Sequence, residues 1–139
     1  MPLNLLIHTD GGARGNPGPA GIGAVIRDAD TGKVLEEISE YIGEATNNQA
    51  EYRAVIRALT QAIAHNPTSI TVHADSELLV KQMSGLYKIK NPGIILRAGE
   101  VKALEARVNI PVHYRHVRRE QNKDADRLAN DAMDRRRNA

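Results

Sequence analysis

Four acidic residues stand near the expected ends of regular elements. Asp10 and Asp75 each close a short, largely apolar run, "LLIHTD" and "SITVHAD", whereas Glu51 and Asp126 fall early in two amphipathic stretches. Carboxylates gathered in a partly dry site repel one another by several kcal/mol unless cations neutralise them. Oxygen ligands without cysteine favour hard ions, Mg²⁺ or Mn²⁺. Three or four carboxylates around two ions about 4 Å apart are the arrangement of two-metal phosphoryl transfer.

Each acid also has an ordinary explanation when it is considered alone. An Asp at the end of a strand is commonly a turn residue, and Glu51 alone would be a helix-surface residue. Asp126 can simply favour an early helix turn through the helix dipole. It is the combination of four acids in one fitting topology that favours a metal site.

The elements that position these acids follow from the hydrophobic pattern. Strands are predicted at Leu5–Asp10, Gly21–Arg27, Lys33–Ile42, Ser69–Asp75 and 110–117. Helices are predicted at 47–67, Glu77–Met83, 91–107 and 122–136, the first with Asn47 or Asn48 as its N-cap and Asn66-Pro67 as its terminator. The order βββαβααβα predicts an α/β fold with a five-stranded mixed sheet, in which strands one to three form an antiparallel meander and strands one, four and five are parallel.

This topology predicts where the acids meet. Parallel neighbouring strands end at the same edge of a sheet, so Asp10 and Asp75 should lie close together, at the edge where open α/β sheets bind ligands. Glu51 shares a helical turn with Ala54, which places it near the sheet-facing side. Asp126 lies one turn into the last helix.

The glycine-rich segment after Asp10 does not match the common nucleotide-binding motifs. Residues 11–21 contain five glycines and two prolines, and the next stretch is a predicted strand. A dinucleotide-binding fingerprint would require its glycines to open a helix. A P-loop would require Ser or Thr after Lys33, where Val stands.

Composition bounds the class of protein. The chain has 139 residues, no cysteine and no tryptophan, with 3% aromatic residues, so we expect one domain over 1–139 with an aliphatic core. The net charge is +2, with Lys and Arg in excess after residue 112; the basic end, 135–139, is expected to be a flexible tail or a substrate contact. We find no signal peptide and no apolar run of membrane-spanning length, and we expect a cytoplasmic monomer.

Four phrases carry a resemblance to a known family. They are "TDGGARGNPGPAG" (Thr9–Gly21), "TNNQAEYRA" (Thr46–Ala54), "ADSELLV" (Ala74–Val80) and "NKDADRLAN" (Asn122–Asn130). In order and spacing they resemble the four signatures of type I ribonuclease H, over nearly the whole chain. The resemblance implies the ribonuclease H-like fold and an endoribonuclease that cleaves the RNA strand of RNA/DNA hybrids, leaving 5′-phosphate and 3′-hydroxyl ends.

The resemblance also implies a role for each acid. Asp10 would bridge two Mg²⁺ ions, for which Mn²⁺ can substitute, and Asp126 would complete the ion that activates water. Glu51 and Asp75 would hold the ion that faces the leaving oxygen. Glu51 would also touch the 2′-hydroxyl beside the scissile phosphate, the group by which proteins distinguish RNA from DNA.

Other positions match the family's substrate contacts. These are Gly11, Gly12, Asn16, Asn47, Asn48 and Ser76. The glycines would let backbone approach a nucleic-acid strand without side-chain obstruction. The amides can bond phosphate, sugar or base edge, which suits recognition that tolerates many sequences.

A catalytic histidine of many relatives has no clear counterpart. His116 has the expected spacing before Asp126 but falls within a predicted strand, and Arg119 occupies the following loop. The phrase resembles an archaeal-type and bacterial subgroup in which Arg takes this role, so we favour Arg119. A guanidinium does not exchange protons at neutral pH, and its role would be electrostatic. We expect His8 and His73 to be packed or hydrogen-bonded rather than metal ligands.

Two substrate-binding parts of some relatives are not expected here. We expect neither a basic, Trp-containing protrusion nor a separate hybrid-binding domain, and therefore weaker binding and lower processivity. The basic groups left for this purpose are Arg14, Lys88, Lys90, Arg118 and Arg119. Two alternatives stay open: a nuclease of this fold that also cuts double-stranded RNA, and a non-catalytic nucleic-acid binder, which would be expected to have lost a metal carboxylate.

Overall fold

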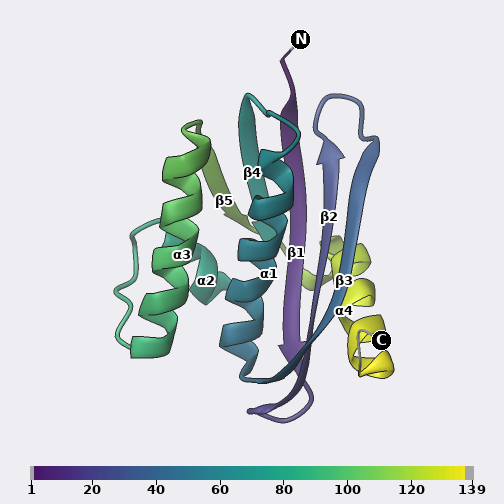
Figure 1. Ribbon diagram of the computed structural model, residues 1–139, viewed down its shortest axis with the longest axis vertical. Helices are drawn as coiled ribbons and strands as arrows, with labels where there is room; N and C mark the ends of the chain where they lie inside the picture. The colour runs from purple at the N-terminus through teal and green to yellow at the C-terminus, as the bar shows by residue number, and fades with distance from the viewer. Residues whose placement is uncertain (1, 137–139) are drawn as a thin grey trace.

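The computed structural model describes residues 2–136 and contains a five-stranded sheet in the order β3-β2-β1-β4-β5 (Figure 1). The strands are β1 (Asn4–Ala13), β2 (Gly18–Asp28), β3 (Val34–Ala45), β4 (Ser69–Ala74) and β5 (Val112–His116). The helices are α1 (Asn47–Ile63), α2 (Glu77–Met83), α3 (Pro92–Val108), the 3₁₀ helix η1 (Arg119–Gln121) and α4 (Lys123–Arg135). Strands β1, β2 and β3 pair antiparallel, and β1, β4 and β5 pair parallel, which confirms the predicted fold.

Helices cover both faces of this sheet. In Figure 1, α1 and α3 lie side by side in front of the strands, and α4 lies behind β2 and β3. The main core lies under α1 and α3, where Ile7, Val55 and Val72 are fully buried. Tyr52 departs from the expected aliphatic core: it is fully buried, and its hydroxyl donates a hydrogen bond of 2.7 Å to Gln82 Oε1. None of the described helices has the length and apolarity to cross a lipid bilayer.

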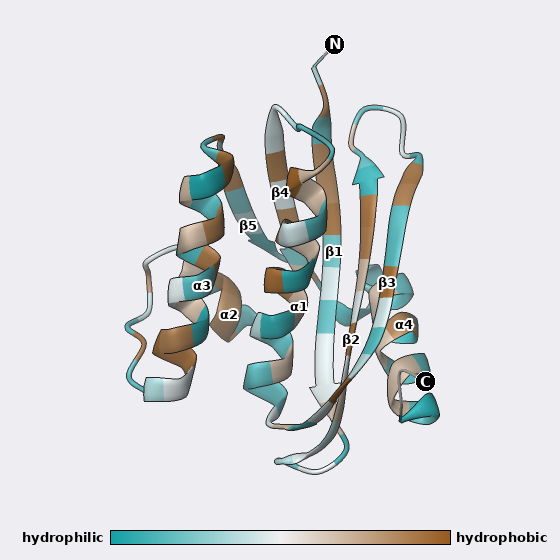
Figure 2. Cartoon of the chain, viewed as in Figure 1, coloured by the Kyte–Doolittle hydropathy of each residue, from teal (hydrophilic) through white to brown (hydrophobic). Residues whose placement is uncertain are grey.

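Strand β1 is longer than predicted. Its parallel ladder with β4 stops at the pair Thr9–Ala74, but its antiparallel ladder with β2 continues to the pair Ala13–Ala20. The expected end at Asp10 was therefore wrong for the strand as a whole, because the glycines that follow are paired in a hairpin rather than forming an open loop. Asp10 marks the end of the parallel ladder only. Figure 2 shows β1 changing from hydrophobic to pale and hydrophilic colours toward this end.

The N-cap of α1 was also predicted wrongly. Thr46 caps the helix, and its hydroxyl accepts a hydrogen bond of 3.2 Å from the Gln49 amide. Asn47 is the first helical residue, and its side chain accepts a hydrogen bond of 2.8 Å from the Ala13 amide in β1. Its amide is thus committed to the hairpin instead of the helix.

The basic C-terminal segment is ordered at its start. Arg135 is the last residue of α4 and donates to the Ser39 carbonyl at 3.0 Å, so the predicted tail does not begin there. Residues 137–139 of that segment lie outside the described part of the chain.

Glycine in β2 is required by the close approach of α4. A Cβ at Gly23 would lie 2.2 Å from the Ala125 carbonyl oxygen, and one at Gly21 would lie 2.6 Å from that of Ala129. These contacts are with backbone atoms, which cannot turn away. The two glycines therefore set how near α4, and the Asp126 that it carries, comes to the sheet.

We predict that Gly23→Ala lowers the free energy of unfolding by about 1–3 kcal/mol or more, because the added methyl group overpacks this contact. Gly99→Ala is the matched control: it lies inside α3 with no atom within 4 Å of the new Cβ. It should raise stability by roughly 0.5–1 kcal/mol. Urea denaturation of both variants measures the difference, and a Gly23→Ala protein as stable as wild type would contradict the close packing of α4.

Candidate active site

Two of the acids meet at one edge of the sheet. Asp10 is the first residue of β1 beyond its pairing with β4, and Asp75 directly follows the last residue of β4. Both carboxylates line a narrow crevice together with Glu51 from α1. The parallel pairing of two strands thus brings together residues that are far apart in the sequence.

Asp126 approaches the same carboxylates from α4. It lines a neighbouring cavity of about 370 Å³, to which Asp10 and Asp75 also contribute. Asp10 and Asp75 therefore belong to both spaces, Glu51 borders one, and Asp126 borders the other. The site is an open hollow with a narrow extension toward α1.

Burial and neighbouring charges raise the pKa of two of these acids, Asp10 and Glu51. Burial raises the pKa of Asp10 from 3.8 to about 8, helped by the charge of Asp75, by a hydrogen bond with Asp126, and by the charges of Asp126 and Glu51. Burial likewise raises the pKa of Glu51 to about 7, and the charge of Asp75 adds to the rise. A hydrogen bond from the Ser76 side chain opposes it. Asp10 and Glu51 therefore keep their protons to higher pH than isolated carboxyl groups do.

The donor set suits a hard divalent cation. Carboxylate oxygens are the ligands that Mg²⁺ and Mn²⁺ prefer, and a positive charge would remove the repulsion that raises these pKa values. Among the described residues, no three acidic, His or Cys side chains are already arranged around one metal position. Asp10 also shares a hydrogen bond with Asp126. The residues thus supply the oxygen ligands that such an ion prefers, but their side chains are not arranged around one ion position.

Two of the predicted substrate-contact residues, Asn16 and Asn47, are hydrogen-bonded at the hairpin between β1 and β2. Asn16 accepts a hydrogen bond of 3.0 Å from the Asn47 amide through its Oδ1 atom, and the Asn47 side chain accepts from Ala13. Asn47 lines the larger cavity, whereas Asn48 lines neither that cavity nor the crevice. The two amides of Asn16 and Asn47 join the hairpin to the N-terminus of α1.

The predicted contact residues Gly11, Gly12 and Ser76 have different surroundings. A Cβ at Gly11 would lie 2.3 Å from the Ala50 carbonyl oxygen, so the close approach of α1 already requires glycine at this position. Gly12 lines the larger cavity, and a Cβ there would meet no atom closer than 3.8 Å. Ser76 caps α2 by accepting a hydrogen bond of 3.2 Å from Leu79, and it borders the crevice beside Glu51.

The two candidates for the loop residue occupy different positions. Arg119 is the first residue of η1 and lines the larger cavity with Asp10 and Asp126. His116 is the last residue of β5 and does not line it. The geometry therefore places a guanidinium, rather than an imidazole, beside the acids.

Sequence reasoning missed part of the cavity wall. Asn130 and Met133 line the cavity from α4, at four and seven residues after Asp126. This spacing places them on the same face of the helix, a signal that was present in the sequence. Arg14 also lines the cavity, and its guanidinium pairs with Asp134 at 2.6 Å.

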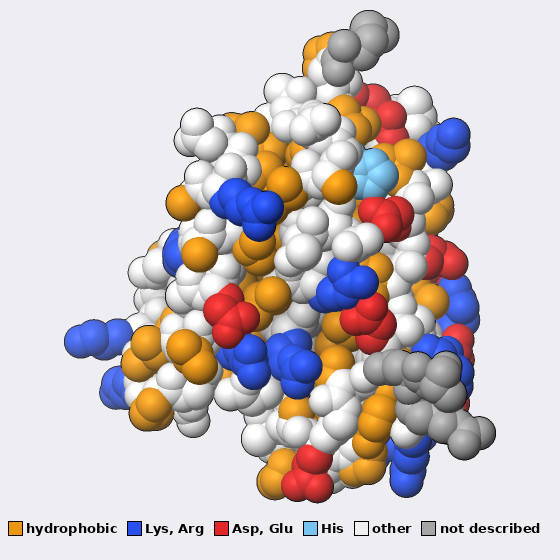
Figure 3. All heavy atoms as spheres, viewed as in Figure 1, with side chains coloured by type: hydrophobic (Ala, Val, Ile, Leu, Met, Phe, Trp, Pro, Cys, Tyr) orange, Lys and Arg blue, Asp and Glu red, His pale blue; other side chains and the backbone are white. Residues whose placement is uncertain are grey.

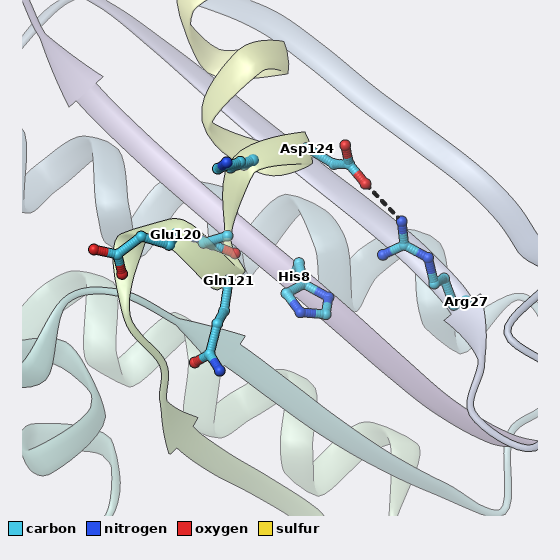
Figure 4. Close-up of a pocket in the computed structure, with 7 residues that line it drawn as sticks. His8, Arg27, Glu120, Gln121 and Asp124 are labelled. Atoms are coloured by element: carbon cyan, nitrogen blue, oxygen red, sulfur yellow. Dashed lines mark hydrogen bonds and ion pairs between the residues drawn. The ribbon is translucent and has the colours of Figure 1, made fainter.

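His8 and His73 pack against each other, as expected. Their ring centroids are 5.0 Å apart in an edge-to-face arrangement, and burial together with His73 and Arg27 lowers the pKa of His8 to about 4. His8 lines a separate cavity of about 270 Å³ with Arg27 and Asp124, whose side chains form an ion pair of 2.8 Å (Figure 4).

Comparisons with known proteins agree with this arrangement. A family model described as reverse transcriptase-like matches residues 8–132. The chain is 47% identical over 132 residues to the bifunctional protein Rv2228c of Mycobacterium tuberculosis, covering 95% of this chain and 36% of that protein. It is 32% identical over 146 residues to the ribonuclease H of Ruthia magnifica, covering 94% of this chain and 95% of that enzyme.

A solved structure is similar to this chain in both fold and sequence. LC11-RNase H1 in complex with an RNA/DNA hybrid superimposes with a TM-score of 0.90 at 45% identity, covering 94% of this chain and 97% of that one. The present chain spans about a third of the length of its mycobacterial relative but nearly all of the Ruthia enzyme. From the matched residues, the sheet order and the fold similarity together, the chain belongs to the type I ribonuclease H family.

Proposed function

We propose that this protein is a metal-dependent endoribonuclease that hydrolyses the RNA strand of RNA/DNA hybrids. The observation that carries the proposal is the interaction of Asp10 with Glu51, Asp75 and Asp126 at one edge of the sheet. The hybrid bound to the similar LC11-RNase H1 supports the choice of substrate. A non-catalytic binder would have little reason to keep four carboxylates whose mutual repulsion opposes folding.

The four carboxylates would hold two Mg²⁺ ions, or Mn²⁺ in their place. Asp10 would contribute to both, Asp126 to the one beside the attacking water, and Glu51 and Asp75 to the one beside the leaving oxygen. When bound, such ions activate water and stabilise charge on the leaving oxygen. In the reaction, the water oxygen bonds to phosphorus and the bond from phosphorus to O3′ breaks. The products are a 5′-phosphate and a 3′-hydroxyl, and the leaving oxygen takes up a proton.

The surrounding residues would hold the RNA strand over the acids. Asn47, at the start of α1, lines the cavity, and Asn16 of the hairpin is hydrogen-bonded to it; their side-chain amides could bond phosphate and ribose. Arg119 would supply a fixed positive charge near the scissile phosphate, since a guanidinium stays protonated. Glu51 would contact the 2′-hydroxyl, which gives the site its preference for RNA.

Substrate grip away from the acids is expected to be weak. Figure 3 shows that the basic side chains on the face of α1 and α3 are interspersed with acidic and hydrophobic ones rather than forming a stripe. Arg57 and Arg97 on this face are paired with Glu40 and Glu100. Because these guanidinium groups are paired with carboxylates, they are less available to neutralise phosphates. The affinity for hybrid should therefore depend on salt less steeply than in relatives with a basic protrusion.

We predict that wild-type protein with Mg²⁺ cleaves the RNA strand of a labelled RNA/DNA duplex and leaves DNA/DNA intact. Asp10→Asn should reduce the cleavage rate by at least about a hundredfold, because it removes the carboxylate shared by both ions. Asp131→Asn is a matched control on α4, since Asp131 lines neither the crevice nor the cavity. Wild-type cleavage of RNA/RNA at a comparable rate would support the double-stranded RNA alternative. An Asp10→Asn protein as active as wild type would contradict the mechanism.

We also predict that, in the absence of metal, the Asp10 carboxyl makes wild type progressively less stable relative to Asp10→Asn as the pH rises from about 4 to about 8. Asp10 has a pKa of 3.8 in the unfolded chain and about 8 in the folded protein, so the folded state binds more protons across this window. The loss should be on the order of a few kcal/mol.

Melting temperatures with and without Mg²⁺ measure this effect. At pH 8, saturating Mg²⁺ should raise the melting temperature of wild type, because the ion binds only the folded state. Asp10→Asn should melt higher than wild type without metal and respond less to Mg²⁺, while Asp131→Asn should behave as wild type. A stability difference between metal-free wild type and Asp10→Asn that stays constant from pH 6.5 to pH 8 would contradict the raised pKa of Asp10.

A further inference from the structure

The segment Val117–Asn122, which carries Arg119, is tied to the sheet at both of its ends. The Val117 amide donates a hydrogen bond of 3.0 Å to the Ala74 carbonyl, and the Asn122 side-chain amide donates one of 2.9 Å to the Thr9 carbonyl. These two carbonyls belong to the residues directly before Asp75 and Asp10. The segment is therefore hydrogen-bonded to the backbone of β1 and β4 directly beside Asp10 and Asp75.

Asn122 also connects this segment to α4. Its backbone amide donates to the Arg119 carbonyl at 2.9 Å, and its own carbonyl accepts from the Asp126 amide at 3.1 Å. One residue therefore contacts η1, the first turn of α4 and the end of the β1–β4 ladder. A change in its position would move Arg119 relative to Asp10.

The usual reason for an asparagine at this place does not apply. Asn122 precedes α4, but its side chain makes no capping hydrogen bond to that helix. It is 1% exposed, and its Oδ1 atom has no hydrogen-bond partner among the described protein residues. A buried polar atom without a partner is costly, so an apolar side chain would pack here at lower cost. Asparagine offsets this cost by donating the hydrogen bond to the Thr9 carbonyl, which an apolar side chain could not make.

Packing alone does not fix the segment. A cavity of about 270 Å³, to whose lining Asn122 contributes, lies against it, with Gln121 on one side and His8 on the other (Figure 4). Arg118 and Arg119 are exposed. Because side chains support the segment on only part of its length, its hydrogen bonds to the sheet must set its position.

We propose that Asn122 is a positioning residue for catalysis, which holds Arg119 at a fixed place over the acids through its bond to the Thr9 carbonyl. The proposal rests on the function proposed above. Asn122 itself does not contact substrate; it acts through Arg119. Loss of its bond leaves the four carboxylates in place and lets the guanidinium move away from the scissile phosphate.

The test is a double-mutant cycle between Asn122→Leu and Arg119→Ala, with kcat and KM for hybrid cleavage measured well below each melting temperature. Leu has the branched shape of Asn without its donor. Asn122→Leu should lower kcat by about tenfold to a hundredfold, the scale of effect of a small misplacement, while KM changes by less than about threefold. In the Arg119→Ala background the same substitution should cost much less, because the group that it positions is gone.

Controls separate positioning from loss of structure. Asn4→Ala removes a side-chain hydrogen bond at the opposite end of β1, with Ser69, and should leave kcat unchanged. Asn122→Asp, which keeps the polarity but loses the donor when ionised, should reproduce the loss of kcat if the Leu variant does not fold. Circular dichroism and melting curves verify folding of each variant.

The outcomes are distinct for the two proposals. If wild type and Asn4→Ala do not cleave hybrid, the proposed function fails. If they cleave and a folded Asn122 variant keeps kcat within about threefold, the role of Asn122 is overturned. Losses from Asn122→Leu and Arg119→Ala that simply multiply would also overturn it, because independent effects show that Asn122 does not act through Arg119.

Discussion

The mutual repulsion of four carboxylates is the constraint on which the rest of this structure depends. Asp10 is buried beside Asp75 and Asp126, and burial together with these neighbouring acids raises its pKa to about 8. Left alone, this arrangement opposes folding at neutral pH, so the remainder of the chain must hold it. The proposed divalent cations would offset this repulsion, so the feature that opposes folding without metal would favour metal binding.

The fold imposes this arrangement with backbone contacts that leave little freedom. The parallel ladder of β1 and β4 stops one residue before Asp10 and Asp75, which places both at one edge. Gly11 lets α1 approach β1 closely, and Gly23 lets α4 approach β2 from the other face. Helices on opposite faces of the sheet thereby bring Glu51 and Asp126 toward the same two strand ends. The same edge anchors the segment of Arg119 through Asn122.

The order of elements and the pairing of the strands were predicted well from the sequence. In strands such as Ser69–Ala74, buried residues alternate regularly with partly exposed ones. Prediction failed where pairing depends on a partner: β1 runs past Asp10 because β2 continues to pair with its glycines, which no local pattern reveals. Thr46 rather than Asn47 caps α1, since Asn47 is drawn away by Ala13 of the hairpin. The roles of the site residues remain predictions, and Asn122 was overlooked because its contact with Thr9 spans 113 positions in the chain.

The most direct measurement of the central claim is the titration of the Asp10 carboxyl carbon by NMR, in metal-free protein and with saturating Mg²⁺. The account predicts an apparent pKa near 8 for Asp10 without metal, coupled to the titration of Glu51, and a fall toward the ordinary value of a carboxyl group when Mg²⁺ is added. A metal-free Asp10 that titrates near 4, or a raised pKa that Mg²⁺ leaves unchanged, would contradict it.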